Sequence, residues 1–250
     1  MGVLSTYYKG FTFDGINSRA YGVYVADVNV FNAPERDVEM ISVPGRNGDL
    51  TIDHGRFENI EVEYDCFVAG DDESDFNSAI SNFRNAIASR VGYKRLTDDF
   101  YSDEYRMASF NDGMSVSQIG RRAGDFKIKF NCKPQRYLTS GETSQSISSG
   151  GTITNPTGFP SRPLIKVTGH GDLSVGNYDI TIDIPETDAP IFIDCDIMES
   201  YQESGGTVEP VNSIVSLSGF DYPVLAPGAT SITFGSGITR VDVTPRWWRI

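Results

Sequence analysis

Two histidines and three cysteines are the residues of this chain best suited to act as bases, nucleophiles or metal ligands. His54 and His170 lie far apart, and no G-x-S-x-G, H-x-E or H-E-x-x-H motif accompanies either of them. The glycines around His170, in GHGD, do not have the spacing of a phosphate-binding loop. Cys66, Cys132 and Cys195 are widely spaced without a CxxC pair, which predicts reduced, buried thiols. The sequence therefore predicts no catalytic, metal-binding or cofactor-binding residues and no cofactor.

Acidic residues offer a second kind of chemistry. Residues 71–75, DDESD, have the composition of a metal or acid/base cluster, but they stand directly before a helical pattern, where carboxylates cap the helix and favour its dipole. A glycosidase needs two carboxylates at a fixed separation, which a sequence alone does not locate. An enzyme is therefore the least favoured function, and we interpret the acidic run as helix capping.

Net charge argues against nucleic-acid binding. The chain has 21 Lys and Arg against 34 Asp and Glu, a formal net charge of −13. An acidic surface repels phosphate backbones. The sequence also lacks a run of about 18 apolar residues, so no membrane span is predicted.

Two strands are predicted by strict alternation of apolar and charged residues. In residues 59–68, NIEVEYDCFV, every second residue is apolar and the residues between include Glu61, Glu63 and Asp65. Residues 125–134, DFKIKFNCKP, alternate in the same way, with lysines on the polar side. Period-two alternation indicates strands with one buried face and one wet face. Because opposite charges on facing strands favour pairing, we predict that these strands are neighbours in one sheet.

A helix is predicted between these strands, at residues 73–91. Its apolar stripe is formed by Phe76, Ile80, Phe83 and Ile87 at helical spacing.

The second half of the chain has a different composition. Residues 138–158 are rich in Ser, Thr and Gly, as in a linker or a run of exposed turns. Short β-type segments then recur about every ten residues, separated by Gly, Pro, Asn and Asp, which is typical of an antiparallel sandwich or barrel. We predict a mainly β protein with one helix and two domains, residues 1–138 and residues 139–250.

Tryptophan side chains near the C-terminus allow a second function. Trp247 and Trp248, in RWWR, would stack on sugar rings if they were exposed, and they would be core or interface anchors if they were buried. The anchor role is favoured. A carbohydrate-binding β-sandwich module remains the alternative function.

Several segments, taken in order, resemble one family. They include PGRNGDL (Pro44 to Leu50), YRMASF (Tyr105 to Phe110) and CKPQRYL (Cys132 to Leu138), followed by PLIKVTGHGDLSV and IFIDCDIMESY in the second half. Their order and spacing are similar to those of the distal tail proteins of bacteriophages with long, non-contractile tails (siphoviruses). The resemblance covers nearly the whole chain.

This resemblance implies a virion structural protein at the tail tip, made and assembled in the bacterial host cytoplasm. Family members form a ring, normally a hexamer, through an N-terminal belt domain that joins the tail tube protein to the tail-associated hub protein. Their C-terminal domain is a galectin-like β-sandwich, which in some relatives helps to hold receptor-binding proteins. The acidic composition suits a ring through which DNA passes, if the carboxylates face the lumen.

The segment VPGRNGDL, residues 43–50, is predicted to be a structural turn. Asn47 and Gly48 are able to supply the positive φ angles of a tight turn. Arg46 and Asp49 are candidate interface residues that would pair across a subunit boundary. A solvent-exposed turn without a partner is the alternative interpretation.

Overall fold

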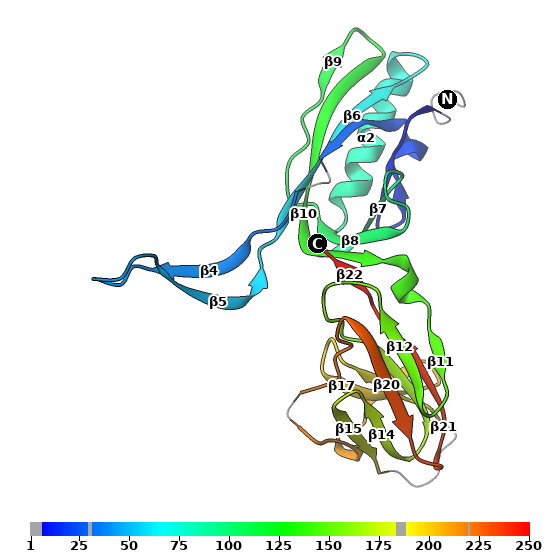
Figure 1. Cartoon of the computed structure of the whole chain (residues 1–250). Coiled ribbons are helices and arrows are strands. Elements are labelled where there is room, and N and C mark those ends of the chain that lie inside the picture. The colour runs from blue at the N-terminus through cyan, green and yellow to red at the C-terminus, as the bar shows by residue number, and fades with distance from the viewer. Residues whose placement is uncertain (1–6, 30–31, 184–188, 220) are drawn as a thin grey trace. The chain divides into compact units, whose positions relative to one another are not determined.

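The computed structural model describes residues 7–29, 32–183, 189–219 and 221–250 (Figure 1). Contacts divide the chain into two compact units, Met1–Arg136 with Ile250 and Tyr137–Arg249. Within the described residues, no helix is long and apolar enough to cross a bilayer.

The first unit is built on a nine-stranded sheet with the order β2-β1-β7-β8-β10-β6-β3, in which β9 and β22 also pair with β10. The strands of this sheet are β1 (Phe11–Phe13), β2 (Ile16–Asn17), β3 (Val23–Asn29), β6 (Ile60–Ala69), β7 (Lys94–Asp98), β8 (Glu104–Ser109), β9 (Ser117–Ile119), β10 (Ala123–Leu138) and β22 (Trp248–Arg249). The contacts assign β22 and the end of β10 to the second unit. A 3₁₀ turn, η1 (Ser18–Tyr21), precedes β3. A separate two-stranded sheet pairs β4 (Arg36–Ile41) with β5 (Leu50–Phe57).

The predicted pairing of the two alternating strands is confirmed. Strands β6 and β10 run antiparallel, with Lys127 opposite Asp65 and Lys129 opposite Glu63. Their apolar residues point into the core, where Val62 and Phe130 are fully buried. One face of this pair is therefore buried and the other presents charge.

Helix α2 (Glu73–Ala88) covers the buried face of the sheet. Asp72 caps it by accepting a hydrogen bond from the Asp75 N–H at 2.8 Å, which assigns the acidic run to capping. The helix ends at Ala88, before the predicted residue 91, and Ser89 is its C-cap. Its buried residues are Phe76, Ala79, Phe83 and Ile87, whereas the predicted Ile80 is only half-buried.

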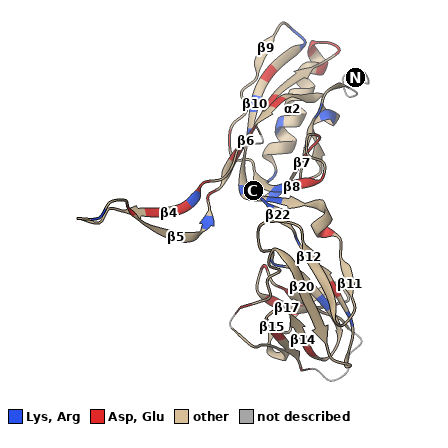
Figure 2. Cartoon of the chain, viewed as in Figure 1, with Lys and Arg blue, Asp and Glu red and all other residues tan. Residues whose placement is uncertain are grey.

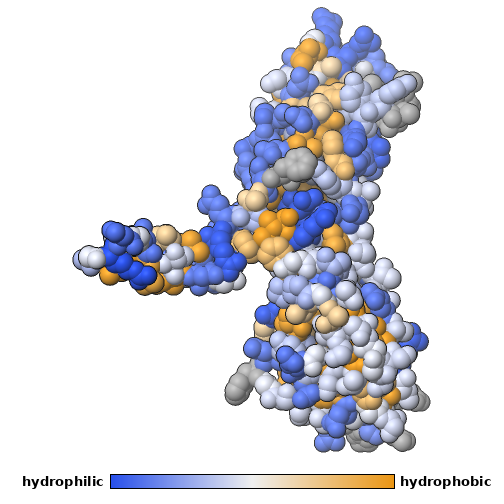
Figure 3. Space-filling view, in the orientation of Figure 1, coloured by the Kyte–Doolittle hydropathy of each residue, from blue (hydrophilic) through white to orange (hydrophobic). Residues whose placement is uncertain are grey.

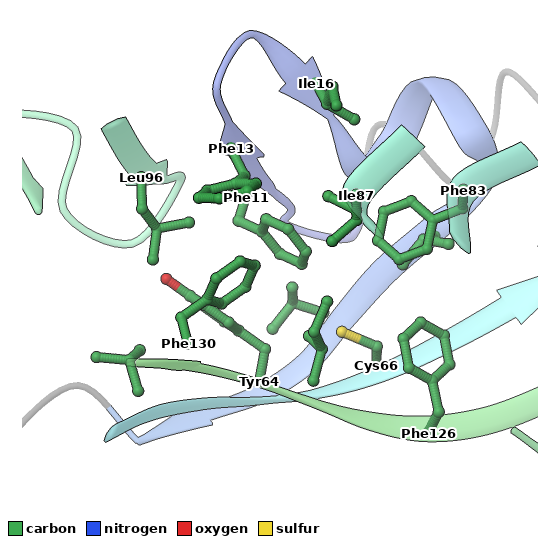
Figure 4. Close-up of a cluster of buried hydrophobic side chains, with 14 of the residues drawn as sticks. Phe11, Phe13, Ile16, Tyr64, Cys66, Phe83, Ile87, Leu96, Phe126 and Phe130 are labelled. Carbon is green, nitrogen blue, oxygen red and sulfur yellow. The ribbon is translucent and has the colours of Figure 1, made fainter. Parts of the chain in front are cut away.

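Aromatic rings fill the core between the helix and the sheet (Figure 4). Phe11 stacks on Tyr64 with ring centroids 4.9 Å apart and meets Phe130 edge-on at 5.4 Å. Such pairs contribute about 0.5–1.5 kcal/mol beyond the burial of their area.

The second unit is an antiparallel β-sandwich. Its six-stranded sheet has the order β11-β21-β13-β16-β17-β18 and its five-stranded sheet the order β12-β20-β14-β15-β19. The strands are β11 (Gln145–Ile147), β12 (Gly151–Asn155), β13 (Leu164–Gly169), β14 (Gly171–Val175), β15 (Tyr178–Ile182), β16 (Ile191–Asp194), β17 (Glu199–Ser204), β18 (Thr207–Pro210), β19 (Val215–Leu217), β20 (Gly228–Phe234) and β21 (Ile238–Thr244). Two 3₁₀ turns are η2 (Thr139–Glu142) and η3 (Asn212–Ile214). Both sheets contribute to one core, so the predicted mainly β fold is confirmed.

One sequence interpretation was wrong in this unit. The Ser, Thr and Gly-rich stretch is not a linker, since it forms η2, β11 and β12. Ile153 and Asn155 of β12 are buried, while Thr152 and Thr154 between them are exposed. Threonine suits the wet face of a strand, so a polar composition is compatible with an edge strand.

Candidate functional site

The residues with the strongest potential for chemistry do not form a reactive site. His54 lies in β5 of the first unit and His170 lies in the second unit. All three cysteines are free and buried, and burial raises the pKa of Cys132 and of Cys195 to about 12. Such thiols stay protonated at neutral pH, so they are poor nucleophiles. Among the described residues, no group of three or more His, Cys, Asp or Glu side chains is arranged to hold a metal ion.

An exposed β-hairpin is the candidate functional site. We call residues 36–57, which contain β4 and β5, the arm. Figure 1 shows the arm extending away from the nine-stranded sheet, and nearly all of its residues are exposed. An isolated two-stranded hairpin is marginally stable in water. The arm therefore lacks the packing that stabilises the other strands of this unit.

Apolar side chains lie on both faces of the arm. Residues opposite each other in an antiparallel pair share a face, so Met40 with Thr51 lies on one face and Ile41 with Leu50 on the other. The exposed apolar side chains of the arm and its tip are Val38, Met40, Ile41, Val43, Leu50 and Ile52, each between 36% and 56% exposed. Figure 3 shows these apolar patches between hydrophilic ones. Clustered exposed apolar residues mark interaction surfaces.

Charged residues near the base of the arm pair with one another (Figure 2). Arg36 contacts Asp53 at 2.5 Å, and Asp37 accepts hydrogen bonds from Arg56 at 2.6 Å and pairs with His54 at 2.8 Å. The hydrogen bond to Asp37 raises the pKa of His54 above its ordinary value. These pairs align β4 with β5, although each is exposed and contributes little to stability.

The tip of the arm holds the predicted interface residues. Arg46 and Asp49 are both exposed, and neither makes an ion pair with any residue that the structure describes. The predicted turn is present, but its positive φ angles belong to Gly45 and Gly48, both at 81°, and not to Asn47. Both side chains are thus available to a partner.

The tryptophans act as structural anchors. Trp247 is 3% exposed in the core of the second unit. Trp248 stacks on Phe159 with ring centroids 4.6 Å apart, and its Nε1–H donates a hydrogen bond to the Pro160 carbonyl. Trp247 is buried and Phe159 stacks on the Trp248 ring, which favours the anchor role over sugar stacking.

A second surface of interest is the charged face of β3, β6 and β10. A hollow of about 720 Å³ opens on this face, lined in part by Phe67, Asp125, Lys127 and Lys129. Lys127 and Lys129 pair with the carboxylates of β6. The sequence predicted this pairing of charges but not the hollow above it.

Comparison with known families and structures indicates what the fold is used for. A family model described as the phage tail protein RIFT-related domain matches residues 23–132. The matched segment is fewer than half of the 250 residues, and within it the chain is similar to the phage tail domain. The matched range contains the arm, helix α2 and most of the charged face. No curated protein sequence matches the chain.

Solved structures share the fold over almost the whole chain. The Dit protein of phage SPP1, described as a paradigm of hub adsorption apparatus in phages that infect Gram-positive bacteria, has a TM-score of 0.75 at 14% identity, covering 97% of this chain and 99% of that one. A chain of the phage P2 baseplate in its activated conformation with calcium has a TM-score of 0.53 at 10% identity, covering 94% and 96%. The corresponding baseplate with strontium gives 0.52 at 10% identity, covering 97% and 98%. The resemblance to siphovirus distal tail proteins is confirmed.

Proposed function

We propose that this phage tail protein is a structural, non-enzymatic component of the tail tip, where six copies form a ring. The ring would join the tail tube protein on one side to the tail-associated hub protein on the other. Support comes from the fold shared with a hub protein of SPP1 and with baseplate chains of P2. The observation that carries the proposal in this chain is the arm, whose apolar side chains remain 36% to 56% exposed among the residues that the structure describes.

A ring requires a heterologous contact, in which one surface of each copy meets a different surface of the next copy. The arm suits this role because it extends from the unit that holds it and exposes apolar residues on both faces. Arg46 and Asp49 at its tip would then pair with the next copy. In this assignment residues 1–138 form the ring domain, and residues 139–250 form the galectin-like domain to which receptor-binding proteins would attach.

We assign the charged face of β3, β6 and β10 to the lumen of the ring. It is the face of the sheet opposite α2, and charged side chains suit contact with water better than contact with protein. Acidic residues outnumber basic ones along its paired stretch, as a DNA passage requires.

Native mass tests the proposal. Light scattering on a sizing column, over a range of concentrations, should give about 165 kDa for six chains of 27.5 kDa each. If the chain alone is monomeric, the measurement is repeated after co-expression with a tail tube or hub protein, which would act as a template. A monomer under both conditions would contradict the ring.

Arg46→Ala and Asp49→Ala test the interface residues separately from the ring. We expect each to raise the concentration at which half of the chains are assembled, because a charge-assisted contact across the boundary is lost. If neither variant changes the assembly concentration, the tip is a solvent-exposed turn without a partner, and Arg46 and Asp49 are not interface residues.

A further inference from the structure

The two lysines of the charged face are each held by carboxylates of the neighbouring strand. Lys127 Nζ contacts Glu63 and lies 3.1 Å from Asp65. Lys129 Nζ lies 2.6 Å from Glu61 and 3.4 Å from Glu63. Glu63 therefore contacts both lysines, and its partners lower its pKa, Lys127 most strongly.

Additional carboxylates surround these pairs on the same face. Strand register places Asp27 of β3 opposite Asp65, and Asp125 of β10 opposite Phe67. The paired stretch of the three strands thus presents five carboxylates and two lysines, and the carboxylates are Asp27, Glu61, Glu63, Asp65 and Asp125. Farther along β10, Lys133 lies over the Tyr93 ring at 5.3 Å. Each of the two lysines near the hollow, Lys127 and Lys129, therefore contacts two carboxylates.

A phosphate backbone binds a protein surface mainly by exchanging its counterions for Lys and Arg side chains. A lysine already held by two carboxylates gains little from this exchange, because the protein contacts must first be broken. The surplus carboxylates would also be brought next to phosphates, which is unfavourable. The geometry of this face therefore suppresses the DNA affinity that two lysines would otherwise provide.

We propose that the carboxylates of β6 mask Lys127 and Lys129 from the phosphates of duplex DNA, with Glu63 as the central masking residue. This inference rests on the proposed function, in which DNA passes through the ring. It assigns a role to the lysines as well: they balance closely spaced carboxylates such as Asp27 and Asp65, which face each other across β3 and β6. The lysines thus reduce repulsion between the carboxylates, and the face keeps a low affinity for DNA.

The test is a triple variant, Glu61→Gln, Glu63→Gln and Asp65→Asn, which unmasks both lysines. Its control is Glu199→Gln, Glu203→Gln and Glu209→Gln, which removes three exposed carboxylates from the second unit and gives the same net charge. Binding to a fluorescent duplex of about 20 base pairs is measured by anisotropy at low salt, about 20 mM. We expect the masking variant to bind at least about tenfold more tightly than the control, with a salt slope steeper by about 2 for two phosphate contacts.

A further variant links any gain to the lysines. Adding Lys127→Gln and Lys129→Gln to the masking variant should abolish the gain. Equal affinities of the masking variant and its control would overturn the inference, as would a gain that survives loss of both lysines. Light scattering of the same samples shows whether the ring forms. If the ring forms but DNA affinity does not increase, only the masking role is contradicted. If DNA affinity increases but no ring forms, only the proposed function is contradicted.

Discussion

Two antiparallel strand pairs of the first unit, β6 with β10 and β4 with β5, have opposite surroundings. In the first pair, one face is packed under α2 and Val62 is fully buried. In the second pair, both faces are exposed and Ile52 retains 39% of its accessible surface. Burial of an aliphatic side chain contributes about 1.5–3 kcal/mol, so this difference determines which pair is stable in a single chain.

The two pairs differ in how their apolar residues are distributed between the two faces. Strands β6 and β10 place their apolar residues on one face, which is covered within the chain. The arm places apolar residues on both faces. A single element of the same chain packed against the arm would cover only one of these faces. The exposure of the arm therefore follows from its residue pattern, and this exposure is what the proposed ring contact would use.

The largest difference is expected from a substitution in the core. Phe130→Ala removes a fully buried ring that contacts Phe11 and Tyr64, and should lower the free energy of unfolding by about 3–5 kcal/mol. Ile52→Ala on the arm should change it by less than about 0.5 kcal/mol. Urea denaturation, followed by far-UV circular dichroism, measures the free energy of unfolding of both variants. A comparable loss in the arm variant would show that the arm is packed within the single chain.

Ion pairs sharpen the comparison because two of them have the same length. Arg136 lies 2.5 Å from Glu104 with both side chains largely buried, at 15% and 4% exposed, whereas Arg36 lies 2.5 Å from Asp53 with 46% and 43% exposed. Glu104→Gln should lower the free energy of unfolding by about 3 kcal/mol, since it leaves a buried charge poorly compensated. Asp53→Asn should leave the unfolding curve unchanged within error, because water replaces the lost contact.

Assembly should respond to the arm and not to other exposed apolar residues. Ile52→Lys should weaken self-association about tenfold or more, which corresponds to about 1.4 kcal/mol, because a charge is buried at the contact. Val91→Lys, at a residue 85% exposed outside the arm, is the matched control and should leave assembly unchanged. Mass as a function of concentration distinguishes the variants. Equal effects of both would show that added charge alone, and not the arm, weakens the ring.

The smallest effect concerns the base of the arm and pH. Because Asp37 raises the pKa of His54, the pairing contributes fully below the unfolded-state value of about 6.5 and is lost as pH rises through the higher folded value. An NMR titration of the His54 ring should show a pKa above the value measured for the same ring in a denatured sample. Asp37→Asn should lower it, and an unchanged titration would show that the pair does not form in solution.

The sequence alone determined the elements whose residue pattern fits only one type of secondary structure. Alternation in residues 59–68 and 125–134 fixed which side chains face the core, and complementary charges predicted the partner strand. The stripe of α2 and its capping run were predicted for the same reason, although the helix ends at Ala88 and not at residue 91. The buried thiols and the anchoring tryptophans were also predicted from residue type and position.

Only the tertiary structure decided which strands pair, which side chains meet and whether a given face is covered. No local pattern shows that β4 and β5 pair only with each other, although apolar residues at both odd and even positions, Met40 and Ile41, were a usable signal. Likewise, the two contacts of Glu63 depend on strand register and side-chain reach, which composition does not contain. A Ser and Thr-rich stretch became strands because a neighbouring strand supplied the hydrogen bonds. Periodicity specifies the face that a side chain occupies, whereas the fold specifies whether anything covers that face.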